Sequence, residues 1–197
     1  MNYLAHLHIA QHCNSNLAGN LLGDFVKGDP QKHFTSDLSN GIKLHRFVDR
    51  YTDSHPIAKQ CKSLFSDEIR RFSPIALDVF WDHFLAKHWS QFHDVELAEF
   101  CVRSHQTIEH QMEPHWPDKF KFVHNKMWHG RWLESYQHID SIKLVLTRMA
   151  QRRPRLSPLE SCYPVLEQEY ELLQRHFFDL YPDILKSADQ FNRQNSA

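Results

Sequence analysis

The sequence predicts an all-α protein that folds as a single-domain helical bundle over residues 1–197. Three observations favour this fold class. Glycine is scarce, with 5 residues against 9 prolines, β-branched runs are few, and apolar residues recur at a helical period in most stretches. With 41% hydrophobic and 13% aromatic residues, the chain has enough apolar surface for a full core. The polar end, about residues 190–197, is expected to fray.

The first forty residues predict two buried segments and a loop. Residues 1–10 are apolar and predict an N-terminal helix, although an extended start would fit the same residues. Residues 16–28 predict a buried helix in which Gly19 and Gly23, one turn apart, permit close approach of another helix. Residues 29–40 predict a loop.

The next segment, residues 37–53, predicts a helix that Ser36 or Asp37 caps. It should end before Pro56, because the residue that precedes a proline is pushed out of helical geometry. An amphipathic helix is expected over residues 57–72.

The second half of the chain predicts further helices. A helix should begin at Pro74, since proline suits the first helical position, and run to about Trp89. The aromatic stretch 114–132 contains two prolines and predicts an irregular packed segment. The other helices are expected over residues 94–113, 138–151 and about 158–178, the last with kinks before Pro164 and near Pro182.

Two groups of carboxylates and imidazoles indicate a metal site. His45, Asp49 and Asp53 fall at i, i+4 and i+8, so they stack along one helical face. In the later apolar helix, Asp82 and the adjacent His83 lie in a run that should form core. Unpaired charges are costly to bury, and a divalent ion shared by both helices would supply the partner.

The types of ligand indicate the chemistry. Carboxylate and imidazole groups suit Mn²⁺, Mg²⁺, Fe²⁺ or Zn²⁺, and such an ion lowers the pKa of its bound water. Three nearby cations, Lys27, Lys43 and Arg46, are expected to bind phosphate oxygens. The chain has no G-x-S-x-G motif and no nucleotide fingerprint. The residues therefore predict a metal-dependent hydrolase of a phosphate ester.

Composition excludes other classes of function. The formal net charge of −1 gives no electrostatic case for a nucleic-acid partner. No run of about 18 apolar residues predicts a membrane span. The four cysteines are scattered and are expected to be free thiols in a reducing compartment, so the protein should be cytoplasmic.

Several stretches together resemble the acyl carrier protein phosphodiesterases. The resemblance implies removal of 4′-phosphopantetheine from holo acyl carrier protein, which leaves the serine of the carrier free. It also implies Mn²⁺ dependence, with Mg²⁺ or Fe²⁺ as alternatives, and a fold like that of the helical HD phosphohydrolases. The stretches are Met1 to His8, Gly19 to Gly28, Gly41 to Asp53, Asp78 to Leu85 with His88-Trp89-Ser90, and Met149 to Leu156.

The order of one residue pair departs from the HD pattern. Asp82 precedes His83 here, whereas the HD pattern has histidine first, so the HD ligand scheme does not transfer directly. We expect Asp24 to be a further ligand or the base that activates water, with His6 and His8 as second choices. The expected metal ligands are Asp24, His45, Asp49, Asp82 and His83, and all of these except Asp49 are also expected to be catalytic.

The resemblance also gives the basic residues a partner. Acyl carrier proteins are acidic, so Arg70 and Arg71, or the segment from Arg152 and Arg153 to Arg155, would steer the carrier by charge. Two alternatives stay open, namely a phosphohydrolase of a small nucleotide such as a guanosine polyphosphate, and a helical interaction protein without enzymatic activity. The sequence leaves the oligomeric state open.

Overall fold

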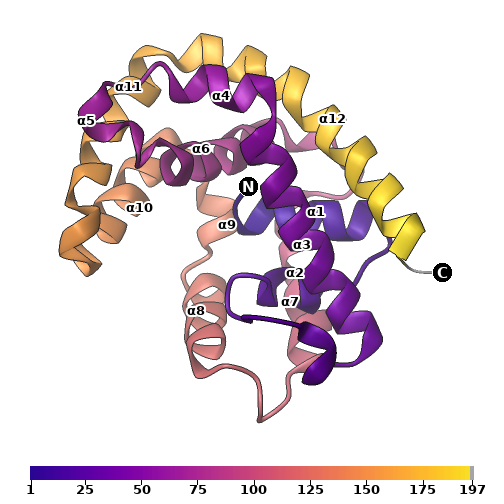
Figure 1. The fold of residues 1–197 in the computed structure, drawn as a ribbon. Coiled ribbons are helices and arrows are strands. Elements are labelled where there is room, and N and C mark those ends of the chain that lie inside the picture. Colours follow the sequence, from indigo (N-terminus) through magenta and orange to yellow (C-terminus); the bar gives the residue numbers. More distant parts are fainter. Residues whose placement is uncertain (196–197) are drawn as a thin grey trace.

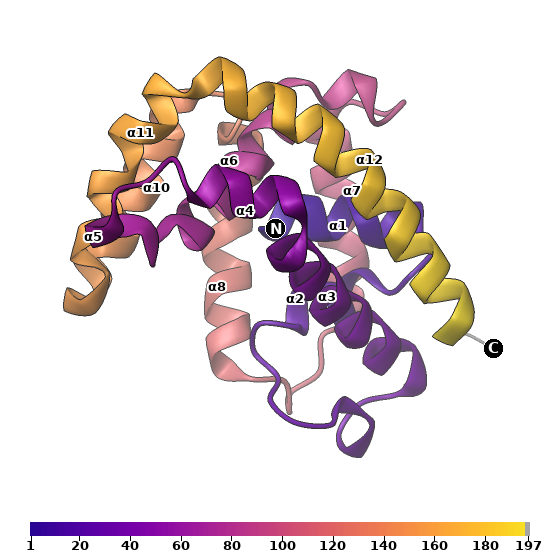
Figure 2. The ribbon, with the colours of Figure 1, turned by 45° about the horizontal axis from the view of Figure 1, so that its top comes forward.

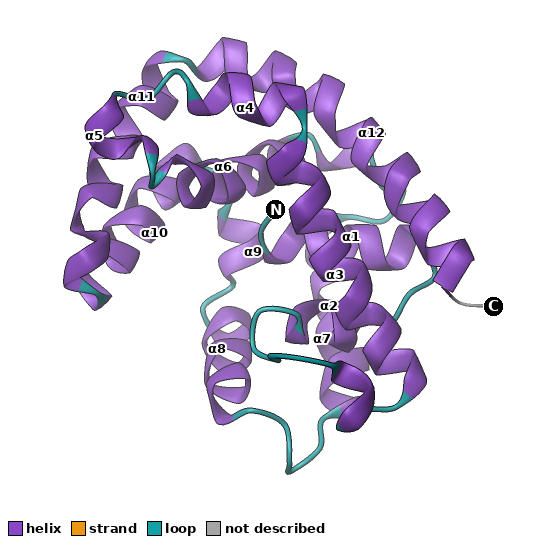
Figure 3. Ribbon diagram, in the orientation of Figure 1, coloured by secondary structure: helices purple, strands orange, loops and turns teal. Residues whose placement is uncertain are grey.

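The computed structural model describes residues 1–195, and this part of the chain contains helices and no strand (Figure 3). The all-α prediction is therefore confirmed. The α-helices are α1 Tyr3–His12, α2 Leu17–Leu22, α3 Ser36–Ser54, α4 Pro56–Lys62, α5 Asp67–Arg70, α6 Ser73–Lys87, α7 Leu97–Gln111, α8 Asp118–His129, α9 Trp132–Ser135, α10 Ile139–Arg152, α11 Tyr163–Gln168 and α12 Tyr170–Asn195. The 3-10 helices are η1 Pro30–Lys32, η2 Trp89–Gln91 and η3 Pro154–Cys162.

The core forms around α1 and α6. Seven consecutive residues of α1, Leu4 to Ala10, are buried, as is most of α6. A helix that is apolar on all sides belongs inside a protein, and α3, α6 and α12 all contact α1. The chain's N-terminus lies near the centre of the ribbon, with α10 on one side and the C-terminal end of α12 on the other (Figures 1 and 2).

Glycine allows α2 and α3 to approach closely. A Cβ atom on Gly41 would lie 3.0 Å from the Cα atom of Gly19 and 2.8 Å from the carbonyl oxygen of Asn16. A Cβ atom on Gly19 would collide with the carbonyl oxygen of Leu38. The expectation that Gly19 permits close helix approach is confirmed.

The bounds of α3 agree closely with the expected 37–53, but the cap differs. The side chain of Thr35 accepts a hydrogen bond from the backbone N–H of Leu38, so Thr35 is the N-cap instead of Ser36 or Asp37. The helix ends at Ser54, and the C-cap residue His55, directly before Pro56, has an extended backbone. This end is the one that the proline predicts.

Two of the expected segments are wrong in outline. The expected helix over residues 57–72 is two short helices, α4 and α5, and buried Phe65 lies in the turn between them. The stretch 114–132, expected to be irregular, contains the regular helix α8. Its buried residues, Phe120, His124 and Met127, follow a helical period, and the two prolines precede the helix instead of interrupting it.

The C-terminal region also differs from the expectation. The segment from residue 158 begins as η3, continues as α11, and is followed by α12 from Tyr170. Pro182 lies inside α12, which continues to Asn195, so residues 190–195 are helical where fraying was expected. Residues 196–197, the rest of that expected tail, lie outside the described residues.

Two further observations concern the four cysteines and the apolar character of the helices. Cys13, Cys61, Cys101 and Cys162 are all buried free thiols, as expected. None of the helices described in residues 1–195 combines the length and the apolar character that crossing a bilayer requires.

Candidate metal centre and active site

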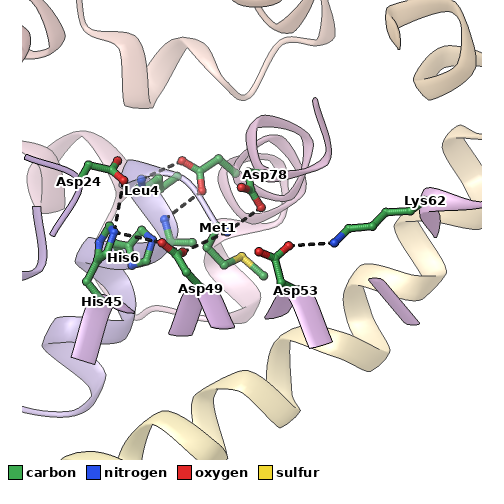
Figure 4. A network of polar contacts seen from close by, with 11 residues as sticks. Met1, Leu4, His6, Asp24, His45, Asp49, Asp53, Lys62 and Asp78 are labelled. Atoms are coloured by element: carbon green, nitrogen blue, oxygen red, sulfur yellow. Dashed lines mark hydrogen bonds and ion pairs between the residues drawn. The ribbon is translucent and has the colours of Figure 1, made fainter. Parts of the chain in front are cut away.

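Four side chains from three segments meet beside the chain's N-terminus (Figure 4). His6 lies on α1, Asp24 follows α2, and His45 and Asp49 lie one turn apart on α3. Nε2 of His6 lies 3.1 Å from Oδ1 of Asp49, and Nε2 of His45 lies 3.1 Å from Oδ2 of the same carboxylate. Nε2 of His45 also lies 3.5 Å from Oδ1 of Asp24. We call these four residues the His–Asp cluster.

The two imidazole rings are fixed by packing. The rings of His6 and His45 stack with centroids 3.8 Å apart and planes 20° apart. A Cβ atom on Gly23 would collide with the ring of His45, so only glycine fits at this position. The Nδ1 atoms of both histidines are buried without a hydrogen-bond partner among the described residues. The polar contacts of both rings are therefore on the Nε2 side, which faces the carboxylates.

The electrostatics of the cluster are strongly coupled. Burial would lower the pKa of His45, but hydrogen bonds to Asp24 and Asp49 outweigh burial and raise it to about 9. Burial and the adjacent His45 lower the pKa of His6 to about 4. Burial would raise the pKa of Asp49, yet His6 and His45 hold it well below its ordinary value. One positive charge thus lies among two carboxylates and two imidazoles.

These residues have the donor set of a divalent cation site. The ligand atoms of His6, His45 and Asp49 lie within 4.8 Å of one another. Both histidines are buried, whereas the side chain of Asp24 is 54% exposed and borders solvent. Two imidazole nitrogens with carboxylate oxygens suit Mn²⁺, Fe²⁺ or Zn²⁺. The chain therefore has a group of side chains that could hold a metal ion.

Asp82 lies next to the cluster with its hydrogen bonds directed elsewhere. Its fully buried carboxylate accepts hydrogen bonds from the backbone N–H groups of Leu4 at 2.8 Å and Ala5 at 3.0 Å. These are free donors of the first turn of α1, so Asp82 caps α1 from α6. Burial raises the pKa of Asp82 to about 7, against the effect of these hydrogen bonds. This contact holds α1, and with it His6, in place.

The structure does not bring His83 to the cluster. Nδ1 of His83 lies 2.7 Å from the carbonyl oxygen of Tyr136, and Nε2 lies 2.8 Å from the hydroxyl of Tyr170. His8 is likewise placed elsewhere, with its ring between the hydroxyl of Tyr181 and the carbonyl of Phe92. Both histidines link helices of the core.

Two further carboxylates, Asp53 of the expected row on α3 and Asp78 of α6, have other partners. Asp53 forms an ion pair with Lys62 at 2.8 Å, at the far end of the network from His45 (Figure 4). Asp78 accepts a hydrogen bond from the α-amino group of Met1 at 2.7 Å. The same amino group lies 3.7 Å from Asp49 and extends the polar network beyond the cluster.

A basic surface borders Asp49. Lys43, Arg46, Asp49 and Arg50 line one open hollow together with Phe191. The guanidinium of Arg46 donates hydrogen bonds to the carbonyl oxygens of Val26 and Gly28, both at 2.7 Å. Arg46 therefore holds the loop that follows Asp24. Lys27, in that loop, is exposed.

The other expected basic residues lie farther along the chain. Arg70 forms an ion pair with Asp67 at 2.6 Å, and Arg71 lies over the ring of Phe72. Arg152 and Arg153 are exposed at the end of α10. Arg152 lines a separate pocket that also includes Tyr3.

Two residues of the candidate site had a minor expected role or none in the sequence. His6 was expected only as a second choice for a ligand or base. A histidine inside a helix that is apolar on all sides itself indicates a site, because its ring needs a buried partner. Arg50 received no role, although it lies one residue beyond Asp49 on α3. Its place beside the cluster depends on how α3 packs.

Fold and site together define a class: an all-helical protein in which two histidines and two aspartates form a cluster that could hold a metal ion. The family model for acyl carrier protein phosphodiesterase matches residues 1–184, and the chain belongs to this family.

Individual relatives of this chain carry the name of the same family. The chain is 42% identical to the acyl carrier protein phosphodiesterase of Enterobacter sp. (strain 638) over 189 residues, which cover 95% of this chain and 97% of that relative. It is 42% identical to the protein of that name from Escherichia coli O6:K15:H31 over 192 residues, or 96% and 98% of the two chains. It is also 42% identical to the acyl carrier protein phosphodiesterase of Yersinia pestis, over 95% of this chain and 97% of that relative. No solved structure matches this chain significantly.

Proposed function

We propose that this protein hydrolyses the phosphodiester bond that joins 4′-phosphopantetheine to the serine of holo acyl carrier protein. Its relatives are named for a phosphodiesterase activity toward this carrier. The observation that carries the proposal is the His–Asp cluster, in which His6, His45 and Asp49 present ligand atoms within 4.8 Å of one another.

The cluster would hold one divalent cation, which we propose to be Mn²⁺. His6, His45 and Asp49 would be its ligands, with Asp24 on the solvent side. Such an ion polarises a phosphoryl oxygen and makes bound water more acidic. No ligand role is proposed for His83, whose two ring nitrogens are both occupied by other groups.

Asp24 is suited to accept a proton. Without metal, the hydrogen bond to His45 outweighs burial and holds the pKa of Asp24 below its ordinary value. With a cation bound to His45, the positive charge of that cation would favour the ionised carboxylate in the same way. The side chain of Asp24 is the more exposed of the two carboxylates that contact His45. We therefore propose that Asp24 orients the attacking water and takes its proton as the water oxygen bonds to phosphorus. The bond from phosphorus to the serine oxygen breaks, and this oxygen takes up a proton to leave the free serine hydroxyl of the carrier.

The basic residues beside Asp49 would receive the carrier. Acyl carrier protein is acidic, and Lys43 and Arg50 face the hollow that Asp49 also lines. Opposite charges would speed encounter and orient the carrier with its phosphodiester at the cluster. Arg46 would contribute by fixing the loop after Asp24, since its guanidinium is bonded to that loop.

The proposed substrate is a protein of the bacterial cytoplasm, and we propose the same compartment for this chain. Four buried free thiols agree with a reducing environment.

The proposal is tested by the mass of the carrier. Purified protein is incubated with holo acyl carrier protein and Mn²⁺, and a parallel sample contains EDTA. Loss of the phosphopantetheine mass only in the sample with metal is expected. An unchanged mass with Mn²⁺, Mg²⁺, Fe²⁺ and Zn²⁺ would refute the proposal, and guanosine tetraphosphate assayed under the same conditions would test the nucleotide alternative.

A further inference from the structure

A pocket of about 270 Å³ lies between the N-terminal residues, α8, α9 and one face of α10. On α10 it is lined by Ser141, Val145, Arg148 and Arg152, which recur at helical spacing and so share one face. The opposite wall includes Tyr3. The volume is close to the lower end of the range for small-molecule sites and is too small for a folded protein segment.

Tyr3 connects this pocket to the His–Asp cluster. It lies three residues before His6 on α1, so the two side chains share a helical face. Burial raises the pKa of the Tyr3 hydroxyl well above its ordinary value, with further increases from the charges of Asp24 and Asp82, whereas Arg152 acts in the opposite direction. Tyr3 and Arg152 line the same pocket, and the charges of Asp24 and Arg152 both act on the Tyr3 hydroxyl.

The lining mixes apolar and polar groups. Leu144 is 47% exposed and is one of three large hydrophobic side chains that residues 1–195 leave exposed. With Val145 and Met149 it gives the pocket an aliphatic side. Ser141 and Arg148 supply hydrogen-bonding groups on the same helix. A neutral chain of methylene groups and amides would satisfy both kinds of surface.

We propose that this pocket binds the pantetheine arm of the substrate, with the phosphate end toward Tyr3 and the arm along α10. The inference rests on the proposed function. In the phosphodiester, the carrier and the pantetheine arm are attached to phosphorus through different oxygen atoms. They therefore extend from the phosphorus in different directions. The basic hollow that would receive the carrier includes Phe191 of α12, and α10 lies on the other side of the chain's N-terminus from that end of α12 (Figures 1 and 2).

This arrangement assigns a specificity role to α10. Arm and carrier would occupy separate surfaces, and the His–Asp cluster would lie between them. A small diester without an arm would use only the cluster. Side chains of the pocket should therefore discriminate between the holo carrier and such a diester.

The test compares Leu144→Trp with a matched control, Val102→Trp. Both side chains are exposed on helices, so both variants are expected to fold, and Val102 lies on α7 outside the pocket. For each variant, kcat/KM is measured with holo acyl carrier protein and with bis(4-nitrophenyl) phosphate. Filling the pocket should lower the ratio of the two values about tenfold in Leu144→Trp. The ratio in Val102→Trp should equal that of the wild type.

A calorimetric titration with free pantetheine separates the pocket from the reaction. Binding to the wild-type protein and to Val102→Trp, with weaker binding to Leu144→Trp, is expected. If the wild type cleaves the carrier but Leu144→Trp behaves like the control in both measurements, the pocket assignment is wrong and the proposed function stands. If the wild type fails to cleave the carrier, the proposed function is wrong, and the titration alone decides whether the pocket binds pantetheine.

Discussion

His6 of α1 and His45 of α3 stack with ring centroids 3.8 Å apart, and both direct Nε2 to the carboxylate of Asp49. Two imidazolium ions cannot share this space, and the opposite pKa shifts of the two rings reflect that conflict. A divalent cation bound to both Nε2 atoms would let both rings be neutral. The stacking therefore links the packing of α1 on α3 to the chemistry of the site.

Gly23→Ala should remove metal binding with little loss of fold. The added Cβ atom would collide with the ring of His45, which must then rotate away from Asp49. We expect Mn²⁺ affinity and hydrolysis to fall together, as measured by electron paramagnetic resonance of free Mn²⁺ and by carrier mass.

The control for this substitution is Gly28→Ala. Gly28 has φ of 73°, so alanine is strained there, but its Cβ atom would have no neighbour within 4 Å. The variant should lose about 1 kcal/mol of stability and keep its metal. Equal metal affinity in the two variants would contradict the role given to Gly23.

Asp82→Asn and Asp49→Asn should separate a helix cap from a metal ligand. The carboxylate of Asp82 accepts from two backbone N–H groups of α1, so its replacement should lower the free energy of unfolding by about 1–3 kcal/mol. Asp49→Asn should abolish hydrolysis with a smaller effect on unfolding. Urea denaturation and the carrier assay measure the two effects, and the reverse pattern would show that Asp82 is the ligand.

The pH dependence of stability should report His83. Burial lowers its pKa to about 4, against the hydrogen bond to the carbonyl of Tyr136. The unfolded chain then binds more protons than the folded chain between about pH 6.5 and pH 4, so the contribution of His83 is complete above this range and falls as the pH falls.

His83→Gln should therefore flatten this dependence. From about pH 7 to pH 5 the wild type should lose of the order of 2 kcal/mol more than the variant, measured by urea denaturation at both pH values. If wild type and variant lost the same free energy, His83 would not be the group that titrates.

Charge reversal beside Asp49 should weaken carrier docking. The double variant Lys43→Glu/Arg50→Glu should raise KM for holo acyl carrier protein at least about fivefold, which corresponds to about 1 kcal/mol, and should make KM less sensitive to salt. Arg175→Glu, an exposed change on α12, is the control. An equal rise of KM in the control would point to net charge instead of a docking surface.

Helical spacing alone predicted that His45 and Asp49 face the same way, because both lie on one regular helix. The same reasoning could have shown that Asp82 and His83 cannot both be ligands of one site. Successive residues of a helix point about 100° apart, so only one of an adjacent pair can face a given site. The place of His6 depends on α1 crossing α3, a long-range contact that no local pattern specifies. The helix α8 was missed because its prolines were taken as interruptions of a segment that they precede.

The central claim is that the His–Asp cluster binds the catalytic metal, and His6→Ala tests it most directly. His8→Gln, on the same helix but bonded to Tyr181, is the matched control. Mn²⁺ binding by electron paramagnetic resonance and the mass of holo acyl carrier protein are followed for both, with circular dichroism as a check on folding. We expect His6→Ala to lose both metal binding and activity and His8→Gln to keep both. A folded His6→Ala that still binds Mn²⁺ and releases phosphopantetheine at the wild-type rate would contradict the claim.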